Sequence, residues 1–331
     1  MTNQQRPLSH SRPLSHSLSH SSIMLLFVLM VCSCGTVFHP EASLVIKVTD
    51  EHGEPIKNAE VGLGFEQGYK NGSPFMKTMT GYTDNNGLFK AKKRTSNLVT
   101  YGAIKVGYYR TNDIHKFSSK AGNRWEPWGQ EVKVVLRKIE KPVPMYAREV
   151  KLSLPTLNEN VGYDLVKSDW MPPYGQGIHS DIAFNAKIRW KNEHDFDGIL
   201  RILFSGSDGL IKIEENMISG SQFKLPRYAP EAEYKHQLTK HIYARPDKDI
   251  EHNYNKNISY IVRIRSTNHD ETKPTVLYGK IRGDFSFDIK NNSAIIVFTY
   301  YLNPDHTRNL EFDPKRNLFT NLPVSEQVNF P

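Results

Sequence analysis

The sequence predicts an all-β protein whose two domains follow an N-terminal leader. Alternating apolar and polar residues recur in short runs, as in 44–49, where Leu44, Ile46 and Val48 share one face. Gly, Pro, Asn and Asp, the residues that favour turns, separate these runs. The composition of 16 Tyr, 16 Phe and 4 Trp favours strands. A length of 331 residues allows two domains of roughly 100 to 200 residues each.

Residues 1–34 are predicted to be a signal peptide. The apolar run 23–31 is too short to cross a bilayer and has the length typical of a signal-peptide core. The next residues, Val31-Cys32-Ser33-Cys34, resemble the lipobox of bacterial lipoproteins. The resemblance implies that Cys34 is lipidated and anchors the chain in the lipid bilayer of the bacterial cell envelope. Gly35, in place of Asp, implies the outer membrane.

The alternative for this leader is an ordinary secretory signal whose two cysteines are accidental. Both cysteines of the chain, Cys32 and Cys34, lie in the leader. The predicted domains therefore contain no disulfide framework, and their stability must come from core burial. A cysteine that ends a leader and is followed by no other cysteine favours lipidation over disulfide chemistry.

The first domain is predicted over residues 41–140. The segment 50–55 breaks the first strand in a hairpin-like corner, after which alternation resumes over 61–65. Asn86-Gly87 lies between strands predicted at 78–84 and 88–91 and predicts a tight hairpin, because both residues accept positive φ. Further strands are predicted at 98–109 and 131–139.

The turn and strand residues of this domain resemble those of the carboxypeptidase regulatory-like, or transthyretin-like, domain. The residues that carry the resemblance are Val48, Asp50, Gly53, Pro55, Ala59, Val61, Thr83, Asp84, Gly87, Phe89, Gly107 and Tyr108. The resemblance implies a seven-strand Greek-key sandwich without catalytic residues, used as an accessory module on secreted and outer-surface bacterial proteins. The long segments 66–76 and 111–130 depart from the family's pattern.

Trp125 and Trp128 lie in the second of these departures, on either side of Pro127. Two indoles on such a loop suit a stacking platform for a sugar or an aromatic ligand. The alternative, which we favour, is that they cover the end of the sandwich or dock on the next domain, because exposed indoles are costly.

A second, mainly β domain, also expected to be a sandwich, is predicted over residues 145–331. Pro142 and Pro144 favour an extended linker before it. Strands are predicted at 150–154, 182–190, 199–204, 259–264, 276–281 and 294–301. One short helix is predicted around 231–242. This half resembles no family of known activity.

A loop at 169–177 supplies the other candidate ligand residues, Trp170 and Tyr174. Pro172 and Pro173 stiffen this loop, so that the two rings suit a ligand groove. Pinning of the loop over the core by its aromatic side chains is the alternative.

No metal site is predicted. The run 193–198 has the Asp-x-Asp-Gly pattern of a calcium loop but lacks the later acidic ligand, so a solvated hairpin turn is the better interpretation. His236, His241 and His252 have neither the zinc-protease spacing nor cysteine ligands nearby.

The sequence carries no serine-hydrolase, phosphate-loop or dinucleotide-binding signature, so we predict no catalytic residues and no cofactor. A net charge of +8 without a long basic block argues against nucleic acid as a partner. The predicted function is a non-enzymatic envelope lipoprotein that presents a surface to a glycan, peptide or protein. An envelope hydrolase is the alternative, with catalytic carboxylates among Asp164, Asp169, Asp181 and Glu215.

Overall fold

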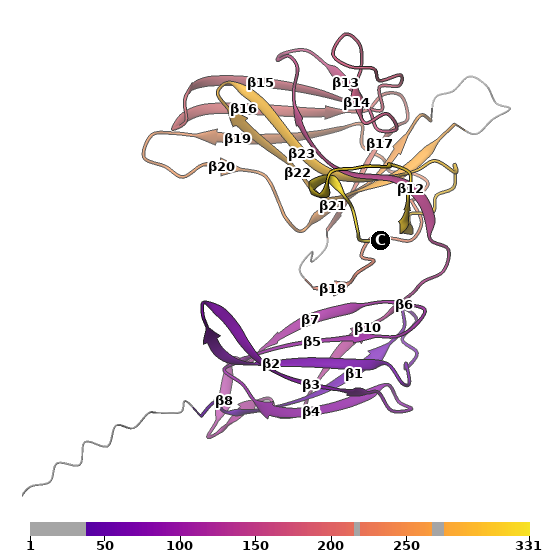
Figure 1. Ribbon diagram of the computed structural model, residues 1–331. Coiled ribbons are helices and arrows are strands. Elements are labelled where there is room, and N and C mark those ends of the chain that lie inside the picture. The colour runs from indigo at the N-terminus through magenta and orange to yellow at the C-terminus, as the bar shows by residue number, and fades with distance from the viewer. Residues whose placement is uncertain (1–37, 215–218, 267–274) are drawn as a thin grey trace, which may run out of the picture. The chain divides into compact units, whose positions relative to one another are not determined.

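The computed structural model describes residues 38–214, 219–266 and 275–331 (Figure 1). Nearly all of the regular structure is β, as predicted. The single helical turn among the described residues is the 3-10 helix Val324–Glu326. Cys34, the predicted lipidation site, lies outside the described residues.

Two sheets form a sandwich in the first half. The first contains β1 (Glu41–Thr49), β4 (Leu88–Arg94), β8 (Ser119–Ala121), β9 (Arg124–Glu126) and β10 (Gln130–Val135). The second has the order β18-β7-β5-β2-β3, with β2 (Glu60–Lys70), β3 (Ser73–Tyr82), β5 (Leu98–Ile104), β7 (Thr111–Lys116) and β18 (Gly220–Ser221). The short strands β6 (Tyr108–Tyr109) and β11 (Arg137–Lys138) pair with each other.

Alternation along the strands builds the core of this sandwich. In β1, Leu44, Ile46 and Val48 are fully buried, as their period of two predicts. They pack in one cluster with inward residues of the opposite sheet, among them Leu63 and Phe65 of β2. The predicted corner after β1 is confirmed, because β1 and β2 belong to different sheets.

The hairpin predicted at Asn86-Gly87 is wrong. The turn exists, but β4 pairs with β1 while β3 pairs with β2 in the other sheet. Only Gly87 has a positive φ there, of 73°. The cause is packing between sheets: a Cβ on Gly81 of β3 would lie 2.2 Å from the ring of Phe89 in β4, so the ring crosses the space that a side chain would fill.

The tight Asn-Gly hairpin lies one turn earlier, at Asn71-Gly72. The φ angles of these residues are 52° and 77°, the combination that a two-residue hairpin turn requires. The segment 66–76, which departs in length from the resembled family, is thus the tip of the β2–β3 hairpin.

Two six-stranded sheets form the second half. The first has the order β17-β21-β22-β23-β12-β24, with β12 (Val143–Ser153), β17 (Gly209–Glu214), β21 (Ile258–Ile264), β22 (Leu277–Lys290), β23 (Ser293–Asn303) and β24 (Phe312–Asn317). The second has the order β14-β13-β15-β16-β19-β20, with β13 (Val161–Asp164), β14 (Asp169–Trp170), β15 (Ile182–Asn192), β16 (Asp195–Leu203), β19 (Gln237–Ala244) and β20 (Glu251–His252).

Aromatic rings from both sheets meet in the core of the second half. Phe184 of β15 packs against Phe285 of β22 and Phe298 of β23, and all three are buried. A sandwich here is as predicted. The six predicted strands are all present, although Leu154, Phe204 and Val276 fall one residue outside the observed strands.

The helix predicted around 231–242 is wrong, because residues 237–244 form strand β19. Lys240, Ile242 and Ala244 are buried on one face of this strand, and Gln237 and Thr239 alternate with them. A lysine at an inward position interrupts the apolar alternation, so the period of two is hard to recognise from sequence.

A buried arginine links segments from both halves. Arg227 is 9% exposed and lies within 3.3 Å of three carboxylates, those of Glu51, Glu140 and Glu311. Residues 39–331 form one compact unit. The boundary predicted at residues 140–145 stays a prediction.

Glu311 is the most deeply buried member of this cluster. Its carboxylate accepts hydrogen bonds from the backbone N–H groups of Glu140 and Lys141 and from the hydroxyl of Tyr109, at 2.8 to 2.9 Å. Burial opposes ionisation, but these donors and Arg227 outweigh it and hold the pKa of Glu311 below its usual value. The side chain of Glu311 therefore fixes the backbone of the predicted linker at Glu140 and Lys141.

Candidate functional site

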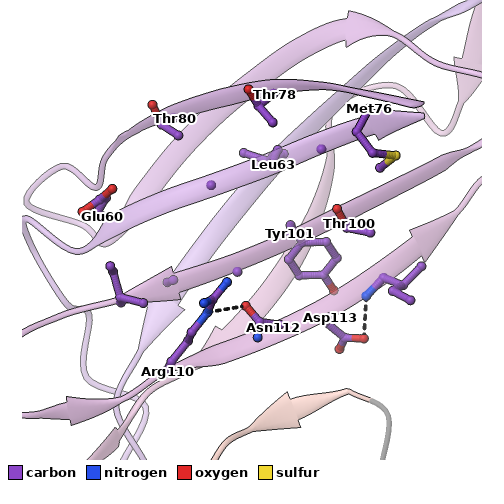
Figure 2. A pocket seen from close by; sticks show the side chains of 16 residues that line it. Glu60, Leu63, Met76, Thr78, Thr80, Thr100, Tyr101, Arg110, Asn112 and Asp113 are labelled. Carbon is purple, nitrogen blue, oxygen red and sulfur yellow. Dashed lines mark hydrogen bonds between the residues drawn. The ribbon is translucent and has the colours of Figure 1, made fainter. Parts of the chain in front are cut away.

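A trough crosses the outer face of the sheet β18-β7-β5-β2-β3. Its volume is about 590 Å³, and Figure 2 shows its side chains. Strand register brings glycines of adjacent strands together here, because Gly62 pairs with Gly102 and the next outward residue of β2 is Gly64. Without side chains at these positions, the backbone forms the floor of the trough.

The three glycines differ in how much room surrounds them. A Cβ on Gly102 would lie 2.5 Å from Oδ1 of Asn112, and one on Gly64 would lie 2.7 Å from Oγ1 of Thr100. A Cβ on Gly62 would meet only Cγ2 of Thr80, at 4.0 Å. The space above Gly62 is therefore open, and a side chain at this position would have room.

Uncharged polar side chains form part of the walls, beside the apolar side chains of Met76, Ile104 and Ile114. Thr78 and Thr80 project from β3, Thr100 from β5 and Asn112 from β7 (Figure 2). Register places these threonines and Asn112 opposite the floor glycines, on the outer face. Nε of Arg110 donates to Oδ1 of Asn112 at 3.0 Å.

Charged side chains line one end of the trough, and an exposed aromatic ring lies on the same face next to them. Glu60 and Arg110 line this end. Tyr82 pairs with Glu60 across β2 and β3, so it shares the outer face, and 68% of its surface is exposed. An exposed ring beside carboxylate and hydroxyl groups is a surface on which a sugar ring can stack.

None of these trough residues was singled out from the sequence. The sequence feature that could have revealed the trough is glycine at three outward positions of two predicted strands, Gly62, Gly64 and Gly102. Glycine is unfavourable inside a strand, and its recurrence marks a close approach of backbone. Only the pairing of β2 with β5 shows that these glycines adjoin.

Trp125 and Trp128 differ in burial, and a ligand role for them stays a prediction. Trp125 packs on the first core, stacks on Phe117 with ring centres 6.0 Å apart, and donates from Nε1 to the carbonyl oxygen of Thr95 at 2.9 Å. Trp128 is 36% exposed, with the guanidinium of Arg124 over its ring at 4.7 Å. Trp125 thus covers the core of its own sandwich, and Trp128 remains accessible.

Trp170 and Tyr174 also differ in burial. Trp170 is half-buried against the second core and makes edge contacts with Tyr163 and Phe184, with ring centres 5.1 and 5.9 Å away. Tyr174 is 44% exposed. The indole of Trp170 therefore anchors the loop to the core, whereas the ring of Tyr174 is accessible to a ligand. A ligand role for the pair stays a prediction.

Two of the candidate catalytic carboxylates converge on one arginine. Arg265 donates to Asp164 at 3.2 Å and to Asp181 at 2.7 Å, beside a cavity of about 500 Å³ that is also lined by His179 and His306. Burial raises the pKa of Asp181 despite Arg265. For Asp164, burial is outweighed by backbone donors and Arg265, and its pKa is lowered.

Hydrogen bonds occupy both of these carboxylates. Asp164 accepts from four backbone N–H groups, those of residues 166, 167, 178 and 179, and Asp181 accepts from that of residue 165. They hold the loop between β13 and β15 in place. Asp169 accepts from backbone N–H groups of its own loop, and Glu215 lies outside the described residues.

A β-hairpin turn joins β15 and β16 as predicted, but it consists of Glu193 and His194, and residues 195–198 belong to β16. His236 and His241 contact the carbonyl oxygen of Asp208 and the carboxylate of Asp197, respectively. Within residues 38–214, 219–266 and 275–331, no group of three or more His, Cys, Asp or Glu side chains could hold a metal ion. The same residues include no helix with the length and hydropathy of a membrane span.

No known family and no curated protein matches this sequence. Among solved structures, the shaft pilin spaA of Lactobacillus rhamnosus GG is 11% identical, with 77% of this chain and 92% of the pilin covered and a TM-score of 0.20. A proposed carbohydrate-binding protein from Bacteroides uniformis ATCC 8492 is 11% identical, with coverages of 80% and 99% and a TM-score of 0.19.

A third similar structure is the 3-chlorocatechol 1,2-dioxygenase of Rhodococcus opacus 1CP. It is 12% identical, and the match covers 30% of this chain and 61% of the dioxygenase, with a TM-score of 0.25. Scores this low support no conclusion about the function of this chain, which has to be inferred from its own residues.

Proposed function

We propose that this protein is a non-enzymatic lipoprotein of the bacterial cell envelope, anchored through Cys34 in the outer membrane, whose trough binds an extended carbohydrate. The trough supports this proposal. A volume of about 590 Å³ falls in the range of ligand pockets, and its glycine floor lets a ligand touch the backbone.

The polar part of the walls suits a sugar. Three threonine hydroxyls and the amide of Asn112 offer both donors and acceptors, which match the hydroxyl groups of a glycan. The exposed ring of Tyr82 provides a stacking face at one end. Each such stacking contact contributes on the order of 1 kcal/mol, so affinity is expected to be weak and to increase with chain length.

An envelope hydrolase has no comparable support. Its best candidates, Asp164 and Asp181, accept hydrogen bonds from backbone N–H groups and from Arg265. These bonds give both carboxylates a role in stabilising the loop between β13 and β15.

Filling the trough at Gly62 is expected to abolish carbohydrate binding. Gly62→Val places a branched side chain in the open space above the floor, and valine suits a strand, so the protein should fold normally. We expect at least a roughly tenfold loss of affinity on an array of bacterial envelope polysaccharide fragments and oligosaccharides. Tyr82→Ala should cost about fivefold, the equivalent of one stacking contact.

Lys90→Val is the matched control, because Lys90 is an exposed residue of β4 in the other sheet. It should bind like the wild type. Unchanged binding by Gly62→Val, or the absence of any carbohydrate ligand on the array, would contradict the proposal. Retention of a peptide by the wild type alone would assign the trough to a protein partner.

Replacement of the anchoring cysteine tests the location separately. Cys34→Ser should incorporate no labelled palmitate when expressed in a bacterial host, and the protein should leave the membrane fraction, since the acyl chains supply the membrane affinity. Cys32→Ser is the control and should label like the wild type. Equal labelling of Cys34→Ser and wild type would show that the leader is an ordinary secretory signal.

A further inference from the structure

A lysine and an aspartate meet inside the second sandwich from opposite sheets. Lys240 lies on β19, Asp284 lies on β22, and their side chains are 5% and 0% exposed. Nζ of Lys240 is 2.6 Å from Oδ2 of Asp284. Lysine and aspartate are rarely buried to this extent, and their contact in the core is independent of the trough.

The backbone is shaped to bring Asp284 to this position. The register of β22 against β23 shifts between Arg282 and Ser286, which marks a β-bulge. Gly283 within it has a φ of 81°, and its N–H donates to Oγ of Ser259 at 3.0 Å. A bulge changes the direction of a side chain, and here it directs Asp284 inward.

Three further groups fix the pair. The hydroxyl of Tyr260 donates to Oδ1 of Asp284 at 2.7 Å, and the backbone N–H of Asn255 donates to Oδ2 at 2.8 Å. Nζ of Lys240 also donates to the carbonyl oxygen of Asn253 at 3.1 Å. The ring of Phe285 packs against that of Tyr260, with centres 5.7 Å apart, and both residues are buried.

We propose that Lys240 and Asp284 condense to form an intramolecular isopeptide bond between Nζ and Cγ. The ammonium first gives a proton to Oδ2, and the neutral amine attacks Cγ. The negative charge that develops on Oδ1 is stabilised by the hydroxyl of Tyr260. The Cγ–Oδ2 bond then breaks, Oδ2 takes a second proton from nitrogen, and water leaves. Nitrogen keeps one hydrogen, Oδ1 becomes the amide carbonyl oxygen, and no oxidant, reductant or further reactant is consumed.

Fixed contact favours this reaction in the core, because it gives the two groups a high effective concentration, as in other intramolecular reactions. The exposed pair of Lys212 and Glu214 has a similar N–O distance of 2.8 Å, but water stabilises its charges and it should not condense.

The bond would fasten β19 to β22 and thus one sheet of the sandwich to the other. Lys240 and Asp284 are 44 positions apart in the chain, and their strands belong to different sheets. A covalent link between sheets limits their separation in the unfolded state and stabilises the fold. Such reinforcement suits a chain that contains no cysteine after residue 34.

Tryptic peptide mapping of the full-length protein tests the bond. Trypsin cannot cleave at a modified Lys240, and Arg245 precedes a proline. The expected product is a branched peptide that joins residues 236–248 to residues 283–290 and is lighter than their sum by one water. Cleavage after Lys212 should be complete, because that lysine remains free.

Two variants complete the test. Lys240→Arg keeps the positive charge but should yield only unlinked peptides, because a guanidinium is a poor nucleophile. Tyr260→Phe keeps the ring and should lower the linked fraction severalfold at early times after synthesis. Quantitative release of unlinked peptides 236–240 and 283–290 from the wild type would overturn the proposal and leave a buried ion pair.

Discussion

Arg227→Ala is expected to lower the free energy of unfolding by about 3 to 5 kcal/mol, the usual cost of removing one partner from a buried ion pair. The guanidinium is 9% exposed and lies 2.9 Å from Glu311, whose side chain has no exposed surface. Without it, the carboxylates of Glu51, Glu140 and Glu311 would remain close together with less compensation. Repulsion between like charges and the cost of a buried charge then both lower the free energy of unfolding.

Urea denaturation followed by intrinsic fluorescence measures this loss. Lys212→Ala is the control, since it breaks an exposed ion pair with Glu214 and should cost less than about 1 kcal/mol. If both variants lose the same small amount, the cluster around Arg227 is not a determinant of stability. The transition of Arg227→Ala also shows whether the two halves unfold together, because the variant weakens the contact between the segments that carry Glu51 and Glu311.

Trp170→Ala is expected to lower the free energy of unfolding by about 2 to 4 kcal/mol. The indole packs on the rings of Tyr163 and Phe184, and its removal leaves a cavity at the margin of the core. Tyr174→Ala in the same loop should stay within about 0.5 kcal/mol, because that ring is 44% exposed. Thermal and urea unfolding of the two variants compare them directly.

The same two variants separate packing from ligand binding. With the trough as the binding site, both should keep wild-type retention on the carbohydrate array. A Trp170→Ala protein that unfolds like the wild type but loses carbohydrate retention would instead assign the ligand face to the loop at 169–177. That outcome would also displace the trough from the proposed function.

Local sequence was sufficient to predict a strand where one face of that strand is apolar. Leu44, Ile46 and Val48 repeat with a period of two, and the structure buries all three. In the second half, the run over 294–301 likewise identified β23. The motif from which lipidation of Cys34 is predicted is also local, since a leader is predicted from a short linear motif.

Prediction from local sequence failed where a contact with a residue far away in the chain determines the structure. Asn86-Gly87 satisfies the rule for a hairpin as well as Asn71-Gly72 does, yet only the latter connects paired strands. The ring of Phe89 lies over Gly81 from the other sheet, and this contact between sheets is invisible in the turn itself. Likewise, Lys240 looks like a surface residue until Asp284 is placed beside it.

By itself, the sequence determined the all-β class, the positions of most strands and the expected lipid anchor, because each depends on residues that are neighbours along the chain. Only the tertiary structure placed Gly62 beside Gly102, Arg227 among three carboxylates and Lys240 against Asp284. In a sandwich, strands far apart in the chain become neighbours by pairing and by packing of opposite sheets. The open floor above Gly62 and the buried pair therefore arise from long-range contacts, which no local pattern encodes.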